Sequence, residues 1–470
     1  MLFVSIYSPN RIDCRSTLHI FPAYKIMKMF SLSQVSEILN TKPLCTAEFK
    51  LNTSVLGIAT DTRTISPREI FIALSGENFD GHNFVNNAVD RGAIAVIVSR
   101  QLDVDVPQFI VEDTLEAYQQ IACWWRDRFD IPVIGITGSV GKTSTKELIS
   151  AVLSTKGKVL KTEANFNNEI GVPKTLLQIT PEHDYAVIEM AMRSAGEIAL
   201  LTDITRPTIG VITNVGTAHI GRLGSREAIA KAKCELLAQM PQSSTAILNY
   251  DNSLLLSTAK LVWQGKTITY GLTGGDISGA IEGDTIKVLG HSFPLPLSGE
   301  HNASNYLAAL AVAKELGLDL DPLIAGLEVE LPKGRSRRYD LADDIVVLDE
   351  TYNAGLESML AALQMLEQTP GKRHIAVLGT MKELGEYSSQ LHRQVGEKAQ
   401  ELNLDLLLVL ADETATEEIA NGAKGINAEC FSDRATLTDK LKEVMRPGDR
   451  ILCKASNSVG LNKVVEELIK

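Results

Sequence analysis

Short apolar runs alternate with stretches of helical periodicity along most of this chain. The segment DTLEAYQQIACWWRDRFD predicts a helix from residue 113, because Asp113 and Glu116 form a capping-box pattern. Its apolar seam occupies positions 115, 118, 122, 125 and 129. Beyond it we predict strands that alternate with helices, at 133–137, 184–191, 208–214 and 245–249. This alternation predicts an α/β fold with a mostly parallel sheet.

The regions on either side of this sheet have their own patterns. Upstream, REIFIALSG and AIAVIV predict strands, with the helix NFVNNAVDRGA between them. Downstream, residues 268–297 are rich in glycine and β-formers, so we expect antiparallel hairpins appended to the sheet. The helix NASNYLAALAVAKELG follows, with Gly317 as its C-terminal cap. From about Leu331 a second alternating series begins, with strands in IVVLDET, HIAVLGT, LDLLLVL and DRILCKAS.

The length of 470 residues predicts more than one domain, and about three is the expected number. Residues 1–28 are a candidate non-native N-terminal extension, because Met27 or Met29 would equally begin the helix in MFSLSQVSEILN. The pattern restarts at the boundaries of the expected domains, which are 29–112, 113–331 and 332–470.

Composition and charge narrow the functional classes. Apolar residues make up 44% of the chain, which is typical of a globular protein, and the formal charge of −12 argues against nucleic-acid binding. No apolar run approaches the ~20 residues of a membrane span. The absence of a C-x-x-C pair predicts a reducing, cytoplasmic location, and nothing in the sequence requires more than a monomer. The six cysteines are at 14, 45, 123, 234, 430 and 453.

The segment VIGITGSVGKTSTKELI runs from a predicted strand through a glycine-rich turn into a predicted helix. This order is typical of a phosphate-binding loop, in which Gly138 and Gly141 let backbone N–H groups approach phosphate oxygens. Lys142 would reach the β- and γ-phosphates, and the Thr143 hydroxyl would bind Mg²⁺. The common spacing G-x-x-x-x-G-K-S/T requires a glycine where this chain has Ile136. The alternative, a glycine turn without a ligand, is disfavoured by the strand-to-helix position of the loop.

Further polar residues follow the next predicted strands, at the edge where parallel α/β sheets gather ligands. Glu189 in DYAVIEMA would complete a magnesium site, and the alternative is a solvated carboxylate at a strand end. Asn214 and His219 follow in VITNVGTAHIGRLGS. A lone histidine is more often structural than a ligand, but at this sheet edge the two roles are about equally expected for His219. Lys231 and Lys233 in EAIAKAKCELL would, taken alone, form a basic helix face.

Together these motifs resemble the Mur ligases of peptidoglycan synthesis. The resemblance runs in order from about residue 50 to 470. It is carried by GITGSVGKTSTKE, TEANFNNEIGVPKTLL, VIEMAMRSAGEI, ITNVGTAHIGRLGSREAIAKAKCELL, GEHNASNYLAALA, LPKGRSRRYDL, LDETYNAGLESM and AVLGTMKELGEYS. The family's loop, T-G-S/T-x-G-K-S/T, lacks the earlier glycine, which accounts for Ile136. The longer form T-G-S-x-G-K-T-S/T-T-K-E, matched by 137–147, is typical of the subgroup that joins D-alanyl-D-alanine to UDP-N-acetylmuramoyl-tripeptide.

The resemblance implies a three-domain, ATP-dependent amide ligase that uses Mg²⁺. We expect a small α/β UDP-binding domain, a central P-loop domain with a parallel sheet, and a C-terminal Rossmann-like domain. ATP would lie between the last two. The ATP contacts that the resemblance implies are Gly138, Ser139, Gly141, Lys142, Thr143, Ser144, Asn302, Arg335, Glu350 and Asn353.

The resemblance also implies metal, catalytic and substrate contacts. The catalytic residues would be Lys142, Lys233 and His219, and the metal ligands would be Thr143, Glu189, His219 and Lys233. Lys233 matches a lysine that several Mur ligases carbamoylate, which turns a cation into an anion able to hold a second Mg²⁺. Contacts with the UDP-sugar-peptide would come from Thr62, Arg63, Asp80, Asn167 and Asn168.

Three departures from the family's pattern lie in the last domain, where the incoming amine is positioned. Y-N-A-N-P-D-S-M reads YNAGLESM, with Gly355 and Leu356 in place of Asn and Pro. V-L-G-D-M-x-E-L-G reads VLGTMKELG, with Thr380 in place of an acid, and Asn457 stands where an arginine is expected. The alternatives are therefore an amide ligase with a different amine, such as a folylpolyglutamate-type enzyme, or a non-catalytic nucleotide-binding paralogue. A phosphoryl-transfer kinase is a further alternative, but no lid or acceptor-hydroxyl motif supports it.

Overall fold

The computed structural model describes residues 30–45 and 48–470, and the chain divides into two compact units between Ala117 and Tyr118. The candidate extension lies outside the described residues. The N-terminal unit is built on a four-stranded parallel sheet, whose strands in spatial order are β3 (Gly57–Ala59), β4 (Glu69–Ile72), β7 (Ala95–Val98) and β8 (Gln108–Ile110). Buried side chains such as Phe71 and Val96 form its core.

Short elements complete the N-terminal unit. They are β1 (Phe30–Ser31), α1 (Leu32–Ile38), β2 (Ser54–Val55), β5 (Ser75–Gly76), β6 (Phe79–Asp80), the 3-10 helix η1 (Gly81–Phe84) and α2 (Val85–Asp90). Ser31 and Gln34 form a reciprocal capping box that fixes the start of α1. The predicted strands are present as β4 and β7. The predicted helix is present as η1 and α2, and it ends early because Gly92, with φ +96°, turns the chain.

Helix α3 (Thr114–Arg126) leads into the second unit. The Asp113 carboxylate accepts the N–H groups of Leu115 and Glu116 at 2.7 and 3.2 Å, as its N-terminal position predicts. Tyr118, Ala122 and Trp125 of the predicted apolar stripe are buried, so α3 packs this stripe against the protein interior.

A seven-stranded sheet forms the centre of the second unit. Its strands in spatial order are β10 (Val159–Lys161), β11 (Tyr185–Glu189), β9 (Val133–Thr137), β12 (Ile209–Ile212), β13 (Thr245–Asn249), β14 (Lys266–Gly271) and β15 (Ile277–Ser278). All of its neighbouring strands run parallel, which confirms the predicted arrangement.

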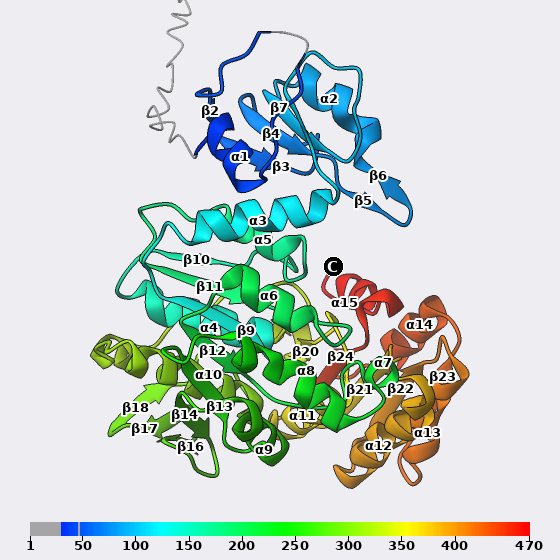
Figure 1. Ribbon diagram of the computed structural model, residues 1–470. Coiled ribbons are helices and arrows are strands. Elements are labelled where there is room, and N and C mark those ends of the chain that lie inside the picture. The colour runs from blue at the N-terminus through cyan, green and yellow to red at the C-terminus, as the bar shows by residue number, and fades with distance from the viewer. Residues whose placement is uncertain (1–29, 46–47) are drawn as a thin grey trace, which may run out of the picture. The chain divides into compact units, whose positions relative to one another are not determined.

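Helices cover both faces of this sheet (Figure 1). Val133 and Ile134 are consecutive in β9 and belong to opposite cores, as the alternation of side chains along a strand requires. The core that contains Ile134 includes α4 (Lys142–Ser154) and α10 (Glu300–Glu315), and Gly317, with φ +68°, follows α10 as predicted. The other core includes α5 (Gly171–Leu176), α6 (Glu197–Thr205), α7 (Ile220–Leu223), α8 (Arg226–Gln239) and α9 (Ser253–Val262).

The expectation of hairpins over 268–297 was wrong in its first part. β14 is a parallel strand of the central sheet, because α9 connects the end of β13 to the start of β14, and β15 pairs with β14 in the same direction. Only the later strands are antiparallel, and they form a separate sheet of β16 (Ala280–Glu282), β17 (Thr285–Val288) and β18 (His291–Pro294).

A six-stranded sheet organises the rest of the chain and contains all four strands predicted there. Its spatial order is β19 (Arg337–Asp340), β20 (Val346–Asp349), β24 (Asp449–Lys454), β21 (Arg373–Gly379), β22 (Leu406–Leu410) and β23 (Ala428–Phe431). β19 is antiparallel and the other pairs are parallel. The helices are α11 (Leu356–Gln368), α12 (Ser388–Glu401), α13 (Glu418–Gly422), α14 (Arg434–Val444) and α15 (Asn462–Leu468).

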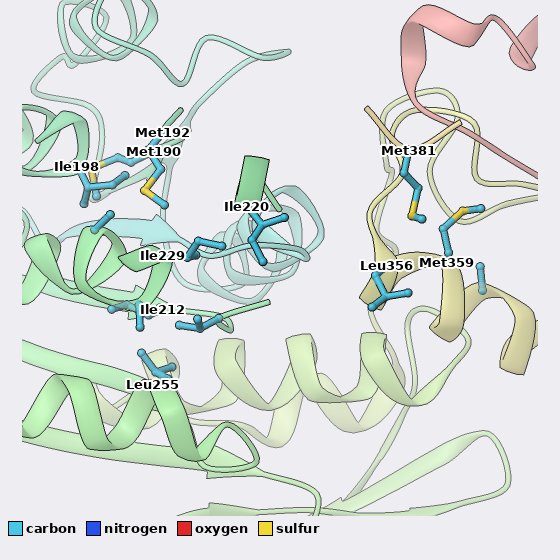
Figure 2. Close-up of a cluster of buried hydrophobic side chains, with 14 of the residues drawn as sticks. Met190, Met192, Ile198, Ile212, Ile220, Ile229, Leu255, Leu356, Met359 and Met381 are labelled. Carbon is cyan, nitrogen blue, oxygen red and sulfur yellow. The ribbon is translucent and has the colours of Figure 1, made fainter. Parts of the chain in front are cut away.

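One buried apolar cluster takes residues from both sheets of the second unit. Figure 2 shows Met190 and Ile220 from the central part and Leu356 and Met381 from the last part. Leu356, which replaces the family's proline, is the first residue of α11 and is 8% exposed, so this departure serves the core. Across the described residues, every helix is too short or too polar for a membrane crossing.

Candidate active site

The phosphate loop joins the end of β9 to the start of α4. Gly138 (φ +155°) and Gly141 (φ +81°) have backbone conformations that other residues rarely adopt. A Cβ atom on Gly138 would lie 1.8 Å from Thr213 Oγ1, so only glycine fits there. The Lys142 ammonium folds over the loop and donates to the Gly138 carbonyl at 2.8 Å. Glycine backbone, a lysine and the N-terminus of a 13-residue helix thus surround one point, which is the arrangement that binds phosphate.

A carboxylate and a hydroxyl meet beside this loop. Thr143 Oγ1 donates to Glu189 Oε2 at 2.9 Å, and Asn167 Nδ2 donates to Glu189 Oε1 at 2.8 Å. The backbone N–H of Glu189 donates to Thr162 Oγ1 at 2.9 Å, so the end of β11 is held from both sides. Two oxygen ligands next to a phosphate loop fit Mg²⁺. No three His, Cys, Asp or Glu side chains gather at metal-binding spacing within the described residues, and the expected ligand set contains only Glu189 and His219 of these types.

Basic groups gather at the same place. Burial lowers the pKa of Lys142, and the Glu189 carboxylate opposes that shift. Burial, and then the charge of Lys142, lowers the pKa of Lys233 well below its usual value. Burial, and then Lys142, also lowers the pKa of His219. Three basic groups therefore lie close together, with Glu189 and Glu383 as the carboxylates beside them, and such a cluster suits an anion such as a phosphate.

A cavity of about 300 Å³ lies between the phosphate loop and the last sheet. This volume is at the lower end of the range for small-molecule sites. Predicted ATP contacts among its lining residues are Ser139, Gly141, Lys142, Thr143, Ser144, Arg335, Glu350 and Asn353. The structure therefore brings together residues that are far apart in sequence.

Arg335 is oriented for a ligand in this cavity. Its guanidinium carbon lies 3.9 Å from the centroid of the Tyr352 ring, a cation–π contact that fixes the plane of the group. Its buried Nε has no hydrogen-bond partner among the described residues. An unpaired buried N–H in a cavity that also contains Lys142 fits a nucleotide phosphate.

Asn302 is placed differently from its neighbours. It is 2% exposed and does not line the cavity. Its amide donates to the Ser298 carbonyl at 2.8 Å and to Ser336 Oγ at 3.3 Å, so its hydrogen bonds stay within the protein. On the same helix, His301 and Asn305 line the cavity, and the sequence reasoning missed them.

Lys454 is a third lining residue that the sequence reasoning missed. Its ammonium donates to the Asn353 carbonyl at 2.9 Å and lies 3.9 Å from Glu350 Oε2. Glu350 also accepts from the backbone N–H of Ser336 at 3.0 Å. The signal for Lys454 was present, because it is the lysine of KASNSVG where the family has K-G-S-R.

The central and last parts of the second unit also meet at what we name the α7–η4 contact. It is formed by residues 219–224 and by residues 383–387, which include the 3-10 helix η4 (Gly385–Tyr387). His219 Nδ1 lies 2.5 Å from Glu383 Oε2. Arg222 Nη2 lies 3.3 Å from the other oxygen of the same carboxylate. The candidate metal ligand His219 is therefore held by a residue from the last part of the chain.

Two glycines, Gly221 and Gly385, lie back to back in the α7–η4 contact. A Cβ atom on Gly221 would lie 2.5 Å from the Gly385 nitrogen, and one on Gly385 would lie 2.8 Å from Gly221 Cα. The Tyr387 hydroxyl donates to the Gly224 carbonyl at 2.8 Å. The approach is thus close enough to exclude side chains at its centre.

The candidate UDP-sugar contacts in the N-terminal unit form two groups. In the first, Arg63 pairs with Asp61 at 2.6 Å and is largely exposed. The carbonyl of Thr62 accepts from Arg91 at 2.9 Å. Thr62 and Arg63 therefore lie on an exposed turn whose backbone Arg91 anchors.

Asp80 forms the second group. It pairs with Arg100 at 2.8 Å and lies 2.6 Å from Nδ1 of the buried His82. The hydrogen bond from Arg100, followed by those from His82, holds the pKa of Asp80 well below its usual range. A carboxylate that is fixed in this way orients its neighbours.

Asn167 and Asn168 have different environments. Asn167 contacts Glu189, as described. Asn168 Oδ1 accepts the backbone N–H of Gly171 at 2.9 Å, at the start of α5. The side chain of Asn168 is thus occupied by the local turn.

The departures near the last sheet are compensated locally. The Thr380 hydroxyl bonds to the Asp412 carboxylate and lies 2.7 Å from Thr416 Oγ1. Lys382 Nζ lies 2.6 Å from Asp412. Burial would raise the pKa of Asp412, but the hydrogen bonds from Lys382 and Thr380 outweigh it and hold that pKa below its usual value. A carboxylate is thus present at this sheet edge although the motif's own acid is absent. Asn457, the third departure, is exposed and is the first residue of the 3-10 helix η6 (Asn457–Val459).

Comparisons with known proteins give a consistent result. Three family models match the chain: Mur ligase family, catalytic domain (54–123), Mur ligase middle domain (136–313), and Mur ligase, glutamate ligase domain (334–457). UDP-N-acetylmuramoyl-tripeptide–D-alanyl-D-alanine ligase of Synechocystis is 58% identical over 93% of this chain and 97% of that protein.

Two solved structures agree with this relationship. MurF from Acinetobacter baumannii has a TM-score of 0.85 and 31% identity over 94% of this chain and 98% of that one. A MurF ligase from Thermotoga maritima in complex with ADP has a TM-score of 0.79 and 30% identity over 87% of this chain and 96% of that one. The expected three-domain fold is therefore confirmed. The chain belongs to the Mur ligase family, in the branch of the UDP-N-acetylmuramoyl-tripeptide–D-alanyl-D-alanine ligases.

Proposed function

We propose that this enzyme joins D-alanyl-D-alanine to UDP-N-acetylmuramoyl-tripeptide in an ATP-dependent reaction that releases ADP and phosphate. The cavity between the phosphate loop and the last sheet carries the proposal, because it combines Lys142 with Arg335 from a different domain. The Synechocystis relative is named for this reaction. The ADP complex of the Thermotoga maritima ligase supports the use of ATP.

The first step follows from the chemistry of the acid. A peptide carboxylate is a poor electrophile, so ATP must convert it into an acyl phosphate. Lys142 and the loop N–H groups would hold the β- and γ-phosphates, and Arg335 would bind a phosphate from the opposite wall. These cations would stabilise the charge that builds on the transferring phosphoryl group. Mg²⁺, bound by Thr143 and Glu189, would neutralise part of that charge.

The second step forms the amide. The amine of the dipeptide attacks the acyl carbon, the tetrahedral intermediate collapses, and phosphate leaves. Closure of the last domain over the cavity would exclude water, which otherwise hydrolyses the acyl phosphate. The Thr380 and Asp412 edge belongs to the domain that would present this amine.

His219 and Lys233 complete the proposed metal site. Lys233 is 1% exposed and lies near two other basic groups, Lys142 and His219. Carbamoylation of its amine would place a negative charge beside Lys142 and His219 and so offset the repulsion among these basic groups. The resemblance to carbamoylated Mur ligases supports the same modification.

Other parts of the proposal rest on sequence. The UDP-sugar would bind the domain 29–112 through Thr62, Arg63 and Asp80, with Asn167 and Asn168 near the peptide. The central and last domains would span 113–331 and 332–470. A monomer in the cytoplasm agrees with the cysteine usage and the composition.

The test is ADP release in the presence of Mg²⁺, ATP and UDP-N-acetylmuramoyl-tripeptide, with and without D-alanyl-D-alanine. We expect ADP only when the dipeptide is present, together with a sugar-peptide product that has gained its mass. ADP without that product would refute the proposed acceptor. A panel of other amines would then identify the amine that the last domain takes.

A further inference from the structure

Glu383 links the last domain to the segment that carries His219. Its carboxylate lies 2.5 Å from His219 Nδ1 and 3.3 Å from Arg222. Its backbone carbonyl accepts the N–H of Gly221 at 3.2 Å. One residue of the last domain thus holds both the ring and the backbone beside it.

The chemistry of this pair sets the state of the ring. A neutral imidazole that donates from Nδ1 to a carboxylate leaves Nε2 as an unprotonated nitrogen. Histidines that bind metals in proteins are commonly oriented in this way by a carboxylate partner. Glu383 therefore selects the tautomer of His219 that has a metal-binding nitrogen.

We propose that Glu383 is a positioning residue that fixes the ring of His219 for magnesium and does so only while the last domain is docked. The inference rests on the proposed function, because that function assigns His219 to the metal site. It adds a physical link between domain docking and metal affinity. ATP-bound magnesium would then be held best when the cavity is closed.

The alternative is an ion pair that only helps the domains to dock. The side chains of His219 and Glu383 are 27% and 35% exposed, and partly exposed ion pairs of this kind contribute little to stability. The domains have other contacts, such as the bond from Tyr387 to Gly224 and that from the Thr217 N–H to Glu357 at 2.7 Å. Loss of the Glu383 carboxylate should therefore change metal affinity rather than docking.

The test compares Glu383→Ala and Glu383→Gln with Tyr387→Phe, a matched control that removes one hydrogen bond from the same contact. Binding of Mn²⁺ in the presence of ADP is measured by electron paramagnetic resonance, with no turnover required. We expect Glu383→Ala to weaken Mn²⁺ binding by about 10- to 100-fold. Glu383→Gln should weaken it less, because its amide oxygen still accepts from Nδ1. Tyr387→Phe should match the wild type.

Turnover gives a second readout. The Mg²⁺ concentration for half-maximal rate should rise in the same order, while kcat at saturating Mg²⁺ recovers. Unchanged Mn²⁺ affinity in Glu383→Ala would overturn the inference, and so would equal weakening in Tyr387→Phe. If Glu383→Ala does not fold, Glu383→Gln decides by the same criterion. A wild-type enzyme that binds Mn²⁺ but forms no product would refute the proposed function and still leave the role of Glu383 tested.

Discussion

Replacement of Glu189 by Gln separates the charge of the proposed magnesium site from its shape. The carboxylate accepts hydrogen bonds from Thr143 at 2.9 Å and Asn167 at 2.8 Å. In the variant, the amide oxygen still accepts from Asn167 and the amide N–H can donate to the Thr143 hydroxyl, which turns to accept. Because both bonds persist, the free energy of unfolding should change by only about 1 kcal/mol.

The lost charge should dominate the effect on activity. Two unit charges about 4 Å apart interact by about 4 kcal/mol at the effective dielectric of a protein, which corresponds to roughly a thousandfold in binding. This is a lower bound for Glu189, because Mg²⁺ is divalent and would lie closer to its ligands. We therefore expect kcat/KM to fall by about 10²- to 10³-fold, and we expect the Mg²⁺ concentration that gives half-maximal rate to rise. The assay is ADP release over a range of Mg²⁺ concentrations, with thermal unfolding measured in parallel.

Glu147→Gln is the matched control. Glu147 is buried like Glu189, but it lies on α4 and outside the cavity. Its carboxylate pairs with Lys146 at 2.9 Å and with Lys161 at 2.5 Å. Its replacement should lower the free energy of unfolding by about 1–3 kcal/mol and leave the Mg²⁺ concentration for half-maximal rate unchanged. If kcat/KM of Glu189→Gln stays within tenfold of the wild-type value and its dependence on Mg²⁺ is unchanged, the assignment of Glu189 to the metal is wrong.

Further outcomes are expected at other sites. Lys233→Ala should reduce ADP release by at least about 100-fold, and added formate should restore part of that activity. Lys231 is exposed, so the control variant Lys231→Ala should release ADP at the wild-type rate. Full activity in Lys233→Ala would falsify the metal role of Lys233. Thr380→Asp restores the family's acid but places its carboxylate against that of Asp412. Thermal unfolding should show a free energy of unfolding lower by about 1–3 kcal/mol, and adding Asp412→Ser to the same chain should recover the loss. Burial raises the pKa of the Cys234 thiol to about 12, so at pH 8 it lacks the reactive thiolate, and mass spectrometry should find it alkylated by iodoacetamide only after unfolding.

Local pattern accounts for what the sequence predicted correctly. The phosphate loop is one continuous strand, turn and helix, so its geometry depends on neighbours in sequence. The position of Glu189 beside Thr143 was predictable because Glu189 ends a strand in a parallel sheet, where register brings side chains to one edge. β14 was misassigned because glycine and β-formers do not show which neighbour a strand will pair with.

Residues whose role depends on distant partners were harder to predict. On α10, His301 and Asn305 line the cavity and Asn302 does not, and the packing of that helix against α4 decides which of its side chains reach the cavity. Glu383 and Asp412 become informative only when folding brings them to His219 and Thr380. No local signal in the sequence gives those distances.

The contact between Gly221 and Gly385 has a consequence for how this family varies over time. Two backbones touch there without any side chain between them. A larger residue at either position cannot be compensated by a smaller one opposite, because the opposite residue has nothing to lose. Each glycine should therefore be retained independently in relatives that dock their domains in this way. Methods that infer proximity from correlated substitutions would find no signal at this contact, although the two backbones touch there.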